Sequence, residues 1–357
     1  MPRPARTASL PPQIDSLYPG ASLPGGEVEL FGSNLGPRGL TTPAVEVDGF
    51  SANLLLSRSS RLGFTVPERA TVGIVEVRTP DGATGDSAGP SNSTQLRIAR
   101  QLSDGLHPVT SPVVSRSGMT FATISGPRGK QTPVSIVRIS PDRVGTPFVS
   151  GILNPTGLAF DPEGKLYVTS RAEGTVYRID AGGEATVYAE GMGVATGAAF
   201  DPEGNLYVGD RSGTIFKIAP AAVGSSPQIF VYATLEPSVA AYHLAMGSDG
   251  TLYVTAPSLS PHDCVWAIDR DGSTSAWFRG LGRPQGLALD SEENIYVAAS
   301  FRGRRGIVRV TQDGHAELVV SGHNLVGLAF SPLGTAVLAT NEAVYDVDLG
   351  VEGLRLF

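Results

Sequence analysis

A unit of 40 to 46 residues recurs from about residue 108 to the end of the chain, and it limits the possible folds more than any other feature. Its best preserved copy runs from Pro155 to Asp180 and holds three apolar runs of about four to six residues, separated by the turns DPEG and SRAEG. Runs of this length that are rich in Val, Tyr, Phe and Leu predict strands. Three or four strands repeated at this period are typical of a β-propeller.

The copies align on the residue just before each run of the Leu-Ala-Phe type. Five clear copies are spaced by 40, 46, 43 and 41 residues, and a divergent first copy stands 46 residues before them. The aligned positions are Ser111, Gly157, Gly197, His243, Gly286 and Gly327. Six copies predict a six-bladed propeller over residues 108–357. Two ways of completing the last blade remain: the final residues GLRLF form its outer strand, or residues 94–102 cross over from the preceding domain.

Residues 12–102 follow a different pattern. Apolar and polar residues alternate with a period of two, as in Val45 and Val47 against Glu46 and Asp48, and turn residues recur about every 8–12 positions. This pattern predicts a small β-sandwich, so the whole chain is expected to be all-β. Residues 1–11 are expected to form a flexible tail, and residues 102–107 a hinge between the two domains.

Spaced motifs in this first domain point to a known family. They are Pro12-x-Ile14 with Pro19, Gly25-Gly26-x-Val28-x-Leu30-x-Gly32, Phe64-x-Val66-Pro67 and Gly73-x-Val75-x-Val77. Over about residues 12–99 the chain thereby resembles the IPT/TIG family. The resemblance implies an immunoglobulin-like fold and a role as an interaction or spacer module. DNA-binding members of that family use basic loops, whereas Arg38, Arg58 and Arg61 here are scattered among acidic residues.

The repeats carry a second resemblance. Their Gly-Leu-Ala-Phe-Asp-Pro-x-Gly-x-Leu-Tyr-Val run and the closing Tyr-Arg-Ile are similar to those of NHL and SMP-30/gluconolactonase-like propellers. This resemblance covers residues 108–357 and implies the fold more than any one activity, because one fold hosts many functions. The calcium-dependent lactonases and esterases of this architecture place Asn and Asp immediately before the inner-strand glycine, with a Glu from another blade.

Composition limits the compartment and the partners. The chain has 27 Lys and Arg against 34 Asp and Glu, a net charge of −7, so no global basic field exists to hold nucleic acid. The single Cys264 cannot form an internal disulfide, and no apolar run approaches the length of a membrane span. The N-terminus has no apolar signal-peptide core, so we expect a cytoplasmic protein, or an extracytoplasmic one if this N-terminus has been trimmed.

The blade topology sorts the candidate residues between two faces. The innermost strand of each blade starts at the face that we call the top, and the DPEG turns lie at the opposite face, the bottom. The residues just before the aligned positions therefore surround the top of the central channel. We expect a small-molecule site at this channel mouth, formed by Thr156, Thr196, Tyr242, His243 and Gln285.

These channel-mouth positions depart from the pattern of the metal-dependent relatives. None is a carboxylate, whereas Ca²⁺ takes six or more oxygens that usually include charged ones. We therefore predict no cofactor; Ca²⁺ or another divalent metal enters only if the chain is an enzyme, with Glu236 and Asn324 as candidate ligands. His243 is a candidate general base, and the alternative is a hydrogen-bonded structural histidine, because no carboxylate is paired with it in the sequence.

Cations gather in the turns between second and third strands, which also lie at the top. Their guanidinium groups suit carboxylate or phosphate, so they predict an anion-binding or partner-binding face. The alternative is that each arginine caps its own loop or pairs with an acid of a neighbouring blade. The residues are Arg128, Lys130, Arg171, Arg211, Arg302, Arg304 and Arg305.

Three functions remain open on the sequence alone. The first is a non-catalytic protein that binds a small anionic ligand or a protein partner at the top of the propeller. The second is a metal-dependent lactonase, hydrolase or lyase acting on a small molecule in the channel. The third is a purely structural repeat protein, with the first domain as its spacer.

Overall fold

The computed structural model describes residues 10–36, 41–80, 87–220, 225–259 and 263–357. All its regular elements are strands, as expected from the sequence, and the described residues contain no helix. No helix of the described chain could therefore cross a membrane. The chain divides into two compact units, the first comprising residues 1–100 with 318–323 and the second residues 101–317 with 324–357.

The first unit has two main sheets around one apolar core. One sheet has the order β1 (Gln13–Tyr18), β3 (Glu27–Ser33), β7 (Arg61–Thr65) and β6 (Asn53–Arg58). The other has the order β10 (Thr94–Gln95), β8 (Ile74–Pro80), β4 (Ala44–Val47) and β5 (Phe50–Ser51), with β9 (Ser87–Pro90) also beside β8. Leu30 and Phe64 of the first sheet share a buried cluster with Val47 and Val75 of the second. The alternation of apolar and polar residues thus directs one face of each sheet inward.

Short strands complete the first unit. β2 (Ala21–Ser22) pairs in parallel with β11 (Arg97–Ile98). It also pairs in parallel with Val320 and Ser321 of β32 (Ala316–Ser321).

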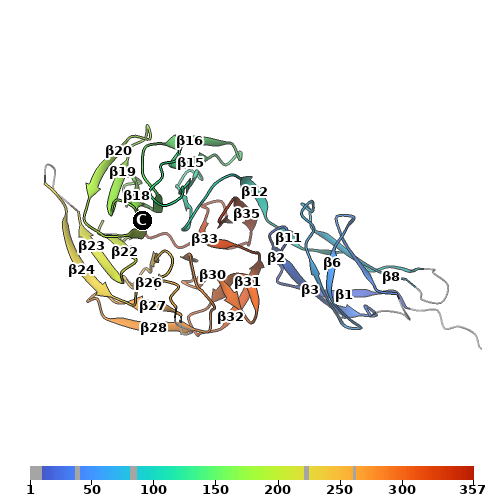
Figure 1. The fold of residues 1–357 in the computed structure, drawn as a ribbon. Helices are drawn as coiled ribbons and strands as arrows, with labels where there is room; N and C mark the ends of the chain where they lie inside the picture. Colours follow the sequence, from blue (N-terminus) through green and yellow to red (C-terminus); the bar gives the residue numbers. More distant parts are fainter. Residues whose placement is uncertain (1–9, 37–40, 81–86, 221–224, 260–262) are drawn as a thin grey trace, which may run out of the picture. The chain divides into compact units, whose positions relative to one another are not determined.

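The second unit consists of antiparallel sheets that follow one another along the chain and stand around a common centre (Figure 1). Each runs outward from its first strand. The first two sheets consist of β13 (Val113–Val114), β14 (Thr120–Thr123), β15 (Ile136–Ile139) and β16 (Gly145–Val149), and of β17 (Pro155–Phe160), β18 (Leu166–Ser170), β19 (Thr175–Ile179) and β20 (Ala185–Ala189). The next two consist of β21 (Ala195–Phe200), β22 (Leu206–Asp210), β23 (Thr214–Ala219) and β24 (Gln228–Thr234), and of β25 (His243–Met246), β26 (Leu252–Thr255), β27 (Cys264–Ile268) and β28 (Thr274–Arg279). The last two contain β29 (Leu287–Leu289), β30 (Ile295–Phe301) and β31 (Arg304–Val310), and β33 (Leu325–Phe330), β34 (Thr335–Thr340) and β35 (Val344–Asp348).

The first strands of successive sheets contact one another around the centre. The contacts run from β13 through β17, β21, β25 and β29 to β33, and β33 contacts β13 in turn. The aligned glycines permit this approach, because a Cβ on Gly157 would lie 2.1 Å from the carbonyl oxygen of Thr196. A Cβ on Gly197 would lie 2.3 Å from the carbonyl oxygen of Tyr242. The recurrence of glycine in the sequence is thus explained by close packing of inner strands.

The last sheet is completed from the start of this unit. β12 (Arg100–Ser103) stands beside β35 as the outer strand. Of the residues 94–102 that one alternative expected to cross over, only residues 100–102 do so, because β10 and β11 pair with β8 and β2 of the first unit. The final residues do not form that strand. The amide of Leu354 donates to the carbonyl oxygen of Leu289 at 2.9 Å, so the C-terminal segment lies along the inner strand β29. An ion pair between Arg143 and Asp346, 3.3 Å apart, joins the sheet of β13–β16 to the sheet of β33–β35.

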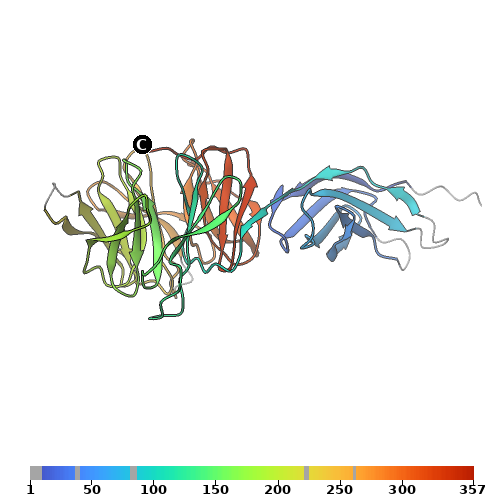
Figure 2. The same cartoon turned by 90° about the horizontal axis from the view of Figure 1, so that it is seen from above.

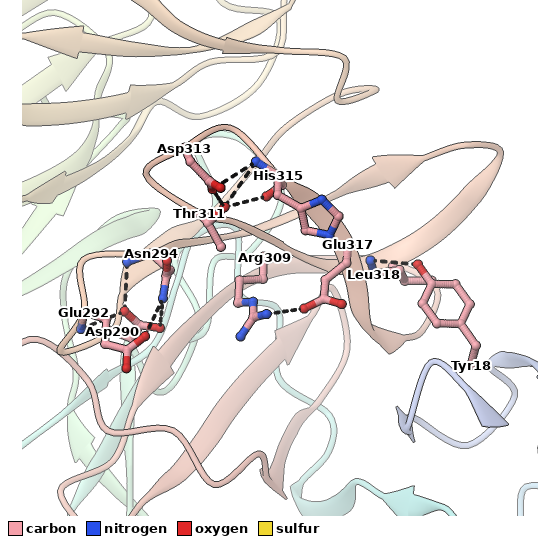
Figure 3. A network of polar contacts seen from close by, with 10 residues as sticks. All are labelled: Tyr18, Asp290, Glu292, Asn294, Arg309, Thr311, Asp313, His315, Glu317 and Leu318. Carbon is pink, nitrogen blue, oxygen red and sulfur yellow. Dashed lines mark hydrogen bonds and ion pairs between the residues drawn. The ribbon is translucent and has the colours of Figure 1, made fainter. Parts of the chain in front are cut away.

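The acids of the bottom turns bond to the backbone of the turns themselves. Asp161 accepts the amides of Glu163 and Lys165 at 3.0 and 2.8 Å. Figure 3 shows the equivalent turn at Asp290, which accepts the amide of Asn294 at 2.8 Å and its side-chain nitrogen at 2.9 Å. These carboxylates are thus bonded to their own loops.

Candidate functional site

The threonines expected at the channel mouth form part of the packing between inner strands. Thr156 and Thr196 are fully buried. The Thr156 hydroxyl donates to the carbonyl oxygen of Asn154 at 3.1 Å. The Thr196 hydroxyl donates to the carbonyl oxygen of Gly209 at 2.9 Å. Thr196 also accepts the amide of Tyr242 at 3.0 Å from the next sheet. Both hydroxyls are engaged with the backbone, and the binding role predicted for them stays a prediction.

Tyr242 and Gln285 are tied to neighbouring segments in a similar way. The buried Tyr242 donates its hydroxyl to the carbonyl oxygen of Glu236, and burial raises its pKa. The backbone carbonyl oxygen of the half-buried Gln285 accepts a hydrogen bond from the Thr255 hydroxyl. Its side-chain nitrogen reaches the carbonyl oxygen of Leu325 at 3.5 Å.

The top of the channel does not fit a calcium ion. Ca²⁺ needs several oxygen ligands directed at one point, whereas the Thr156 and Thr196 hydroxyls bond the backbone. Glu236 and Asn324 are exposed and belong to segments that lead into different strands, β25 and β33. The described residues contain no group of three or more His, Cys, Asp or Glu side chains that could hold a metal ion.

Three of the predicted cations lie together at the top. Arg128 is in the loop before β15, Arg171 in the turn after β18 and Arg211 in the turn after β22. Burial, and then the nearby charges of Arg211 and Arg128, hold the pKa of Arg171 below its usual value. The structure thus brings Arg128, Arg171 and Arg211 into one electrostatic cluster, which we call the arginine cluster.

The arginine cluster has no carboxylate partner among the described residues. Arg171 donates to the carbonyl oxygen of Gly126 at 3.4 Å, and Arg211 donates to the carbonyl oxygen of Val239 at 3.2 Å. The Nε atoms of both arginines are buried and without a partner in the described chain. Glu173 in the same turn as Arg171 instead accepts the Tyr177 hydroxyl at 2.9 Å; burial and this bond raise the pKa of Tyr177 to about 12.

Asn154 fixes the loop that carries Arg128, and the sequence analysis did not identify it. Its side-chain nitrogen donates to the carbonyl oxygens of Gly126 and Pro127 at 2.8 and 3.1 Å, and its side-chain oxygen accepts the amide of Gly129 at 2.7 Å. Asn154 is buried and has a φ of 46°, a left-handed conformation that Asn tolerates better than most residues. In the sequence, the sign of this role is an asparagine that directly precedes the inner strand of one copy.

Asp210 holds the turn of Arg211 in a comparable way. The buried carboxylate accepts the amide of Val194 at 2.7 Å and the hydroxyl of Ser212. The carbonyl oxygen of Arg211 accepts the amide of Ser238 at 3.0 Å, and the Ser238 hydroxyl donates to Pro257 at 2.8 Å. The long segments before β25 and after β26 thus form a rim beside Arg211. Residues 260–262 of the second segment lie outside the described residues.

The other predicted cations are not part of this cluster. Lys130 is exposed on the Arg128 loop. Arg302, Arg304 and Arg305 belong to the hairpin of β30 and β31, whose sheet is three places further round the centre from that of Arg171. Arg302 lies over the ring of Phe301, 4.9 Å from its centroid.

A cavity of about 780 Å³, which we call the bottom cavity, runs along the inner strands from His243 at the start of β25 to the bottom turns. Residues of the inner strands line its wall, and residues 161 and 163–164 of a bottom turn reach its rim. Residues 352–357 form another part of the wall, and the C-terminus lies near the centre of the ring in Figure 1 and at one face of it in Figure 2. No motif of the sequence indicates this cavity.

His243 is the one predicted site residue that both lines this cavity and begins an inner strand in the described chain. It is 3% exposed, and burial lowers its pKa to about 3, so its ring is neutral near pH 7. Neither ring nitrogen has a partner among the described residues. The hydrogen-bonded structural role considered above is therefore absent from the described contacts, and no carboxylate is paired with His243 for general-base catalysis.

Known proteins resemble this chain in structure only. No known family profile matches it, and no curated protein matches it in sequence. An auxiliary nutrient binding protein from Bacteroides thetaiotaomicron aligns at 13% identity over 96% of this chain and 99% of its own, with a TM-score of 0.52. A protein of unknown function from the same organism aligns at 16% identity over 97% and 99%, with a TM-score of 0.56.

A gluconolactonase from Xanthomonas campestris aligns with the repeat region. The identity is 15%, the alignment covers 71% of this chain and 90% of that one, and the TM-score is 0.58. At such identities the likeness concerns the fold alone. The chain accordingly has a β-propeller fold of the gluconolactonase-like type. Structural neighbours include both a binding protein and an enzyme, and this is compatible with either kind of function.

Proposed function

We propose that the protein is a non-catalytic, ligand-binding six-bladed propeller whose arginine cluster binds a ligand bearing carboxylate or phosphate groups. The six blades correspond to the six sequence copies and to the contacts that run from β13 round to β33. We propose further that the first unit is an immunoglobulin-like IPT/TIG module that acts as an interaction or spacer domain. Two sheets around one core, together with the spaced glycine and proline motifs, support that assignment.

One observation carries the binding proposal. Arg171 is half-buried beside Arg211 and Arg128, and these charges disfavour its protonated form. An anion placed between them would remove this repulsion and would accept charge-assisted hydrogen bonds from planar guanidinium groups. Arg171 and Arg211 donate to carbonyl oxygens and not to carboxylates, and Arg128 is exposed, so the positive charge of the cluster is left for such a ligand.

A thermal melt tests the proposal. At a concentration ten times its dissociation constant, a bound anion stabilises the folded protein by about 1.4 kcal/mol, which raises the Tm of a domain of this size by about 3 to 5 °C. Citrate and phosphate are compared with chloride at equal ionic strength, because the screening of charges is then equal in the three salts. Citrate and phosphate also stabilise folded proteins in general by exclusion from the surface. A rise with citrate or phosphate that is smaller in Arg171→Gln/Arg211→Gln is therefore expected. Equal melting in all three salts would favour the purely structural alternative.

The metal-dependent lactonase or hydrolase alternative lacks a comparable observation. Its metal would have to be held at the top of the channel by Thr156, Thr196, Tyr242 and Gln285, with Glu236 or Asn324. The first two hydroxyls bond backbone carbonyls, and the last two residues are exposed on separate segments. These residues do not fit a divalent ion, so we derive no step through one.

A further inference from the structure

We propose that the bottom cavity is a second binding site, which takes an uncharged and largely apolar small molecule with one hydroxyl or amide group that hydrogen-bonds to His243. The site is separate from the arginine cluster, because Arg128, Arg171 and Arg211 are not among the residues that line the cavity. It therefore does not depend on the function proposed above.

The position of His243 explains why space exists around it. Four of the other five aligned positions carry glycine, because a Cβ there would meet the next strand at 2.1 Å for Gly157 and 2.3 Å for Gly286. His243 has a Cβ and a full ring at this position and is still accommodated. The backbone next to His243 must therefore be further away than it is at the glycines. The ring fills a place that the copies with glycine leave to backbone packing.

His243 contributes to the cavity wall, and the polar atoms of its ring are left unpaired by the described residues. The Thr110 hydroxyl donates to the carbonyl oxygen of Thr156 at 2.6 Å, and Ser111 accepts the amide of Leu328 at 3.3 Å. Both nitrogens of His243 are buried and have no partner among the described residues. Buried polar atoms nearly always have a partner in folded proteins. A neutral imidazole offers one donor and one acceptor, and a hydroxyl or an amide can satisfy them.

The rest of the wall sets the class of ligand. Apolar side chains line the cavity, among them Phe160, Phe200, Met246, Leu289, Leu328 and Phe330. The charged groups at the rim already have partners: Glu352 pairs with Arg355 at 2.9 Å, and Arg116 donates to the carbonyl oxygen of Pro162 at 3.1 Å. A volume of about 780 Å³ falls within the usual range of small-molecule sites. An apolar molecule with a single polar group suits these walls.

Two matched fluorescent probes test this site. 2-Naphthol and naphthalene have the same ring system, and only 2-naphthol has a hydroxyl group. We expect the wild-type protein to bind 2-naphthol about tenfold or more tightly than naphthalene, which corresponds to one buried hydrogen bond to the ring. In His243→Phe the two probes should bind equally. In His243→Gln, whose amide again offers a donor and an acceptor, the preference should return in part.

Controls separate this proposal from the first one. The Arg171→Gln/Arg211→Gln variant should bind 2-naphthol as the wild type does, and His243→Phe should bind citrate as the wild type does. The ¹⁵N resonances of the His243 ring should shift with 2-naphthol and not with naphthalene. This measurement needs only the wild-type protein, so it decides the matter even if His243→Phe fails to fold. An absence of 2-naphthol binding, a preference that persists in His243→Phe, or unchanged ring resonances would overturn the proposal.

Discussion

The amide of Arg171 donates to the carbonyl oxygen of Asn154 at 3.2 Å, and this links the turn of one cation to the residue that fixes the loop of another. The Asn154 side chain bonds three groups in residues 126–129 around Arg128. A single buried asparagine therefore positions two arginines on adjacent sheets. The arginine cluster is built into the fold and does not arise from independent surface side chains.

Replacing Asn154 should loosen this cluster. Asn154→Gly keeps the left-handed backbone available and removes the side-chain bonds, so we expect a loss of stability of about 1–3 kcal/mol, because buried groups lose their partners. Asn154→Ala should lose about 1 kcal/mol more, since alanine disfavours a positive φ. Chemical denaturation measures both. Citrate affinity should fall equally in the two variants; unchanged affinity in both would show that Asn154 does not position the cluster.

The buried neutral His243 should destabilise the protein in acid. Its folded pKa of about 3 lies below the unfolded value near 6.5, so the unfolded state binds more protons at lower pH. The stability that the neutral ring contributes to the folded protein is fully present above about pH 6.5. It is lost as the pH falls, by up to about 1.4 kcal/mol per pH unit between about pH 6 and 4. His243→Gln does not titrate in this range and should show a correspondingly smaller loss in denaturation curves; parallel pH profiles would contradict the burial of a neutral ring.

The inner-strand glycines should tolerate no side chain. Gly157→Ala places a Cβ 2.1 Å from a backbone carbonyl oxygen of the next sheet, so we expect destabilisation by about 3 kcal/mol or more. Gly145→Ala is the matched control, because the nearest atom to its Cβ would be 3.7 Å away, an ordinary contact. That control should change stability by less than about 0.5 kcal/mol. Similar effects of the two substitutions would argue against close packing of β17 on β21.

Divalent metal should not affect the fold. Because the channel-mouth residues offer no suitable set of oxygens, we expect the Tm to change by less than about 1 °C on adding Ca²⁺ or EDTA. Differential scanning calorimetry at equal ionic strength measures this. A reproducible rise with Ca²⁺ that EDTA reverses would restore the metal-dependent alternative.

The sequence predicts those parts of this protein that depend on local pattern. Alternating residues and turn glycines predict the strands, and the spacing of the copies predicts the successive sheets. The turn topology also placed Arg128, Arg171 and Arg211 at the same end of their sheets. Their mutual proximity follows from the packing of neighbouring sheets, which only coordinates reveal.

Other parts of the protein depend on packing between residues that are far apart in the sequence, and no periodic pattern of residues predicts them. Asn154 acts through a loop 24 to 28 residues earlier in the chain. The bottom cavity depends on how far the inner strands diverge and on the path of residues 352–357. The hydroxyls of Thr156 and Thr196 bond the backbone, because neighbouring inner strands approach closely, and no pattern in the sequence indicates these bonds.

Isothermal titration calorimetry with citrate tests the central claim most directly. The wild-type protein is compared with Arg171→Gln/Arg211→Gln and with Arg270→Gln, which removes an exposed cation from a bottom turn. Each lost charge-assisted hydrogen bond is worth at least about 1.5 kcal/mol, so the double variant should bind about 100-fold more weakly. Arg270→Gln should bind as the wild type does. Equal affinities in all three proteins would contradict an anion site at the arginine cluster.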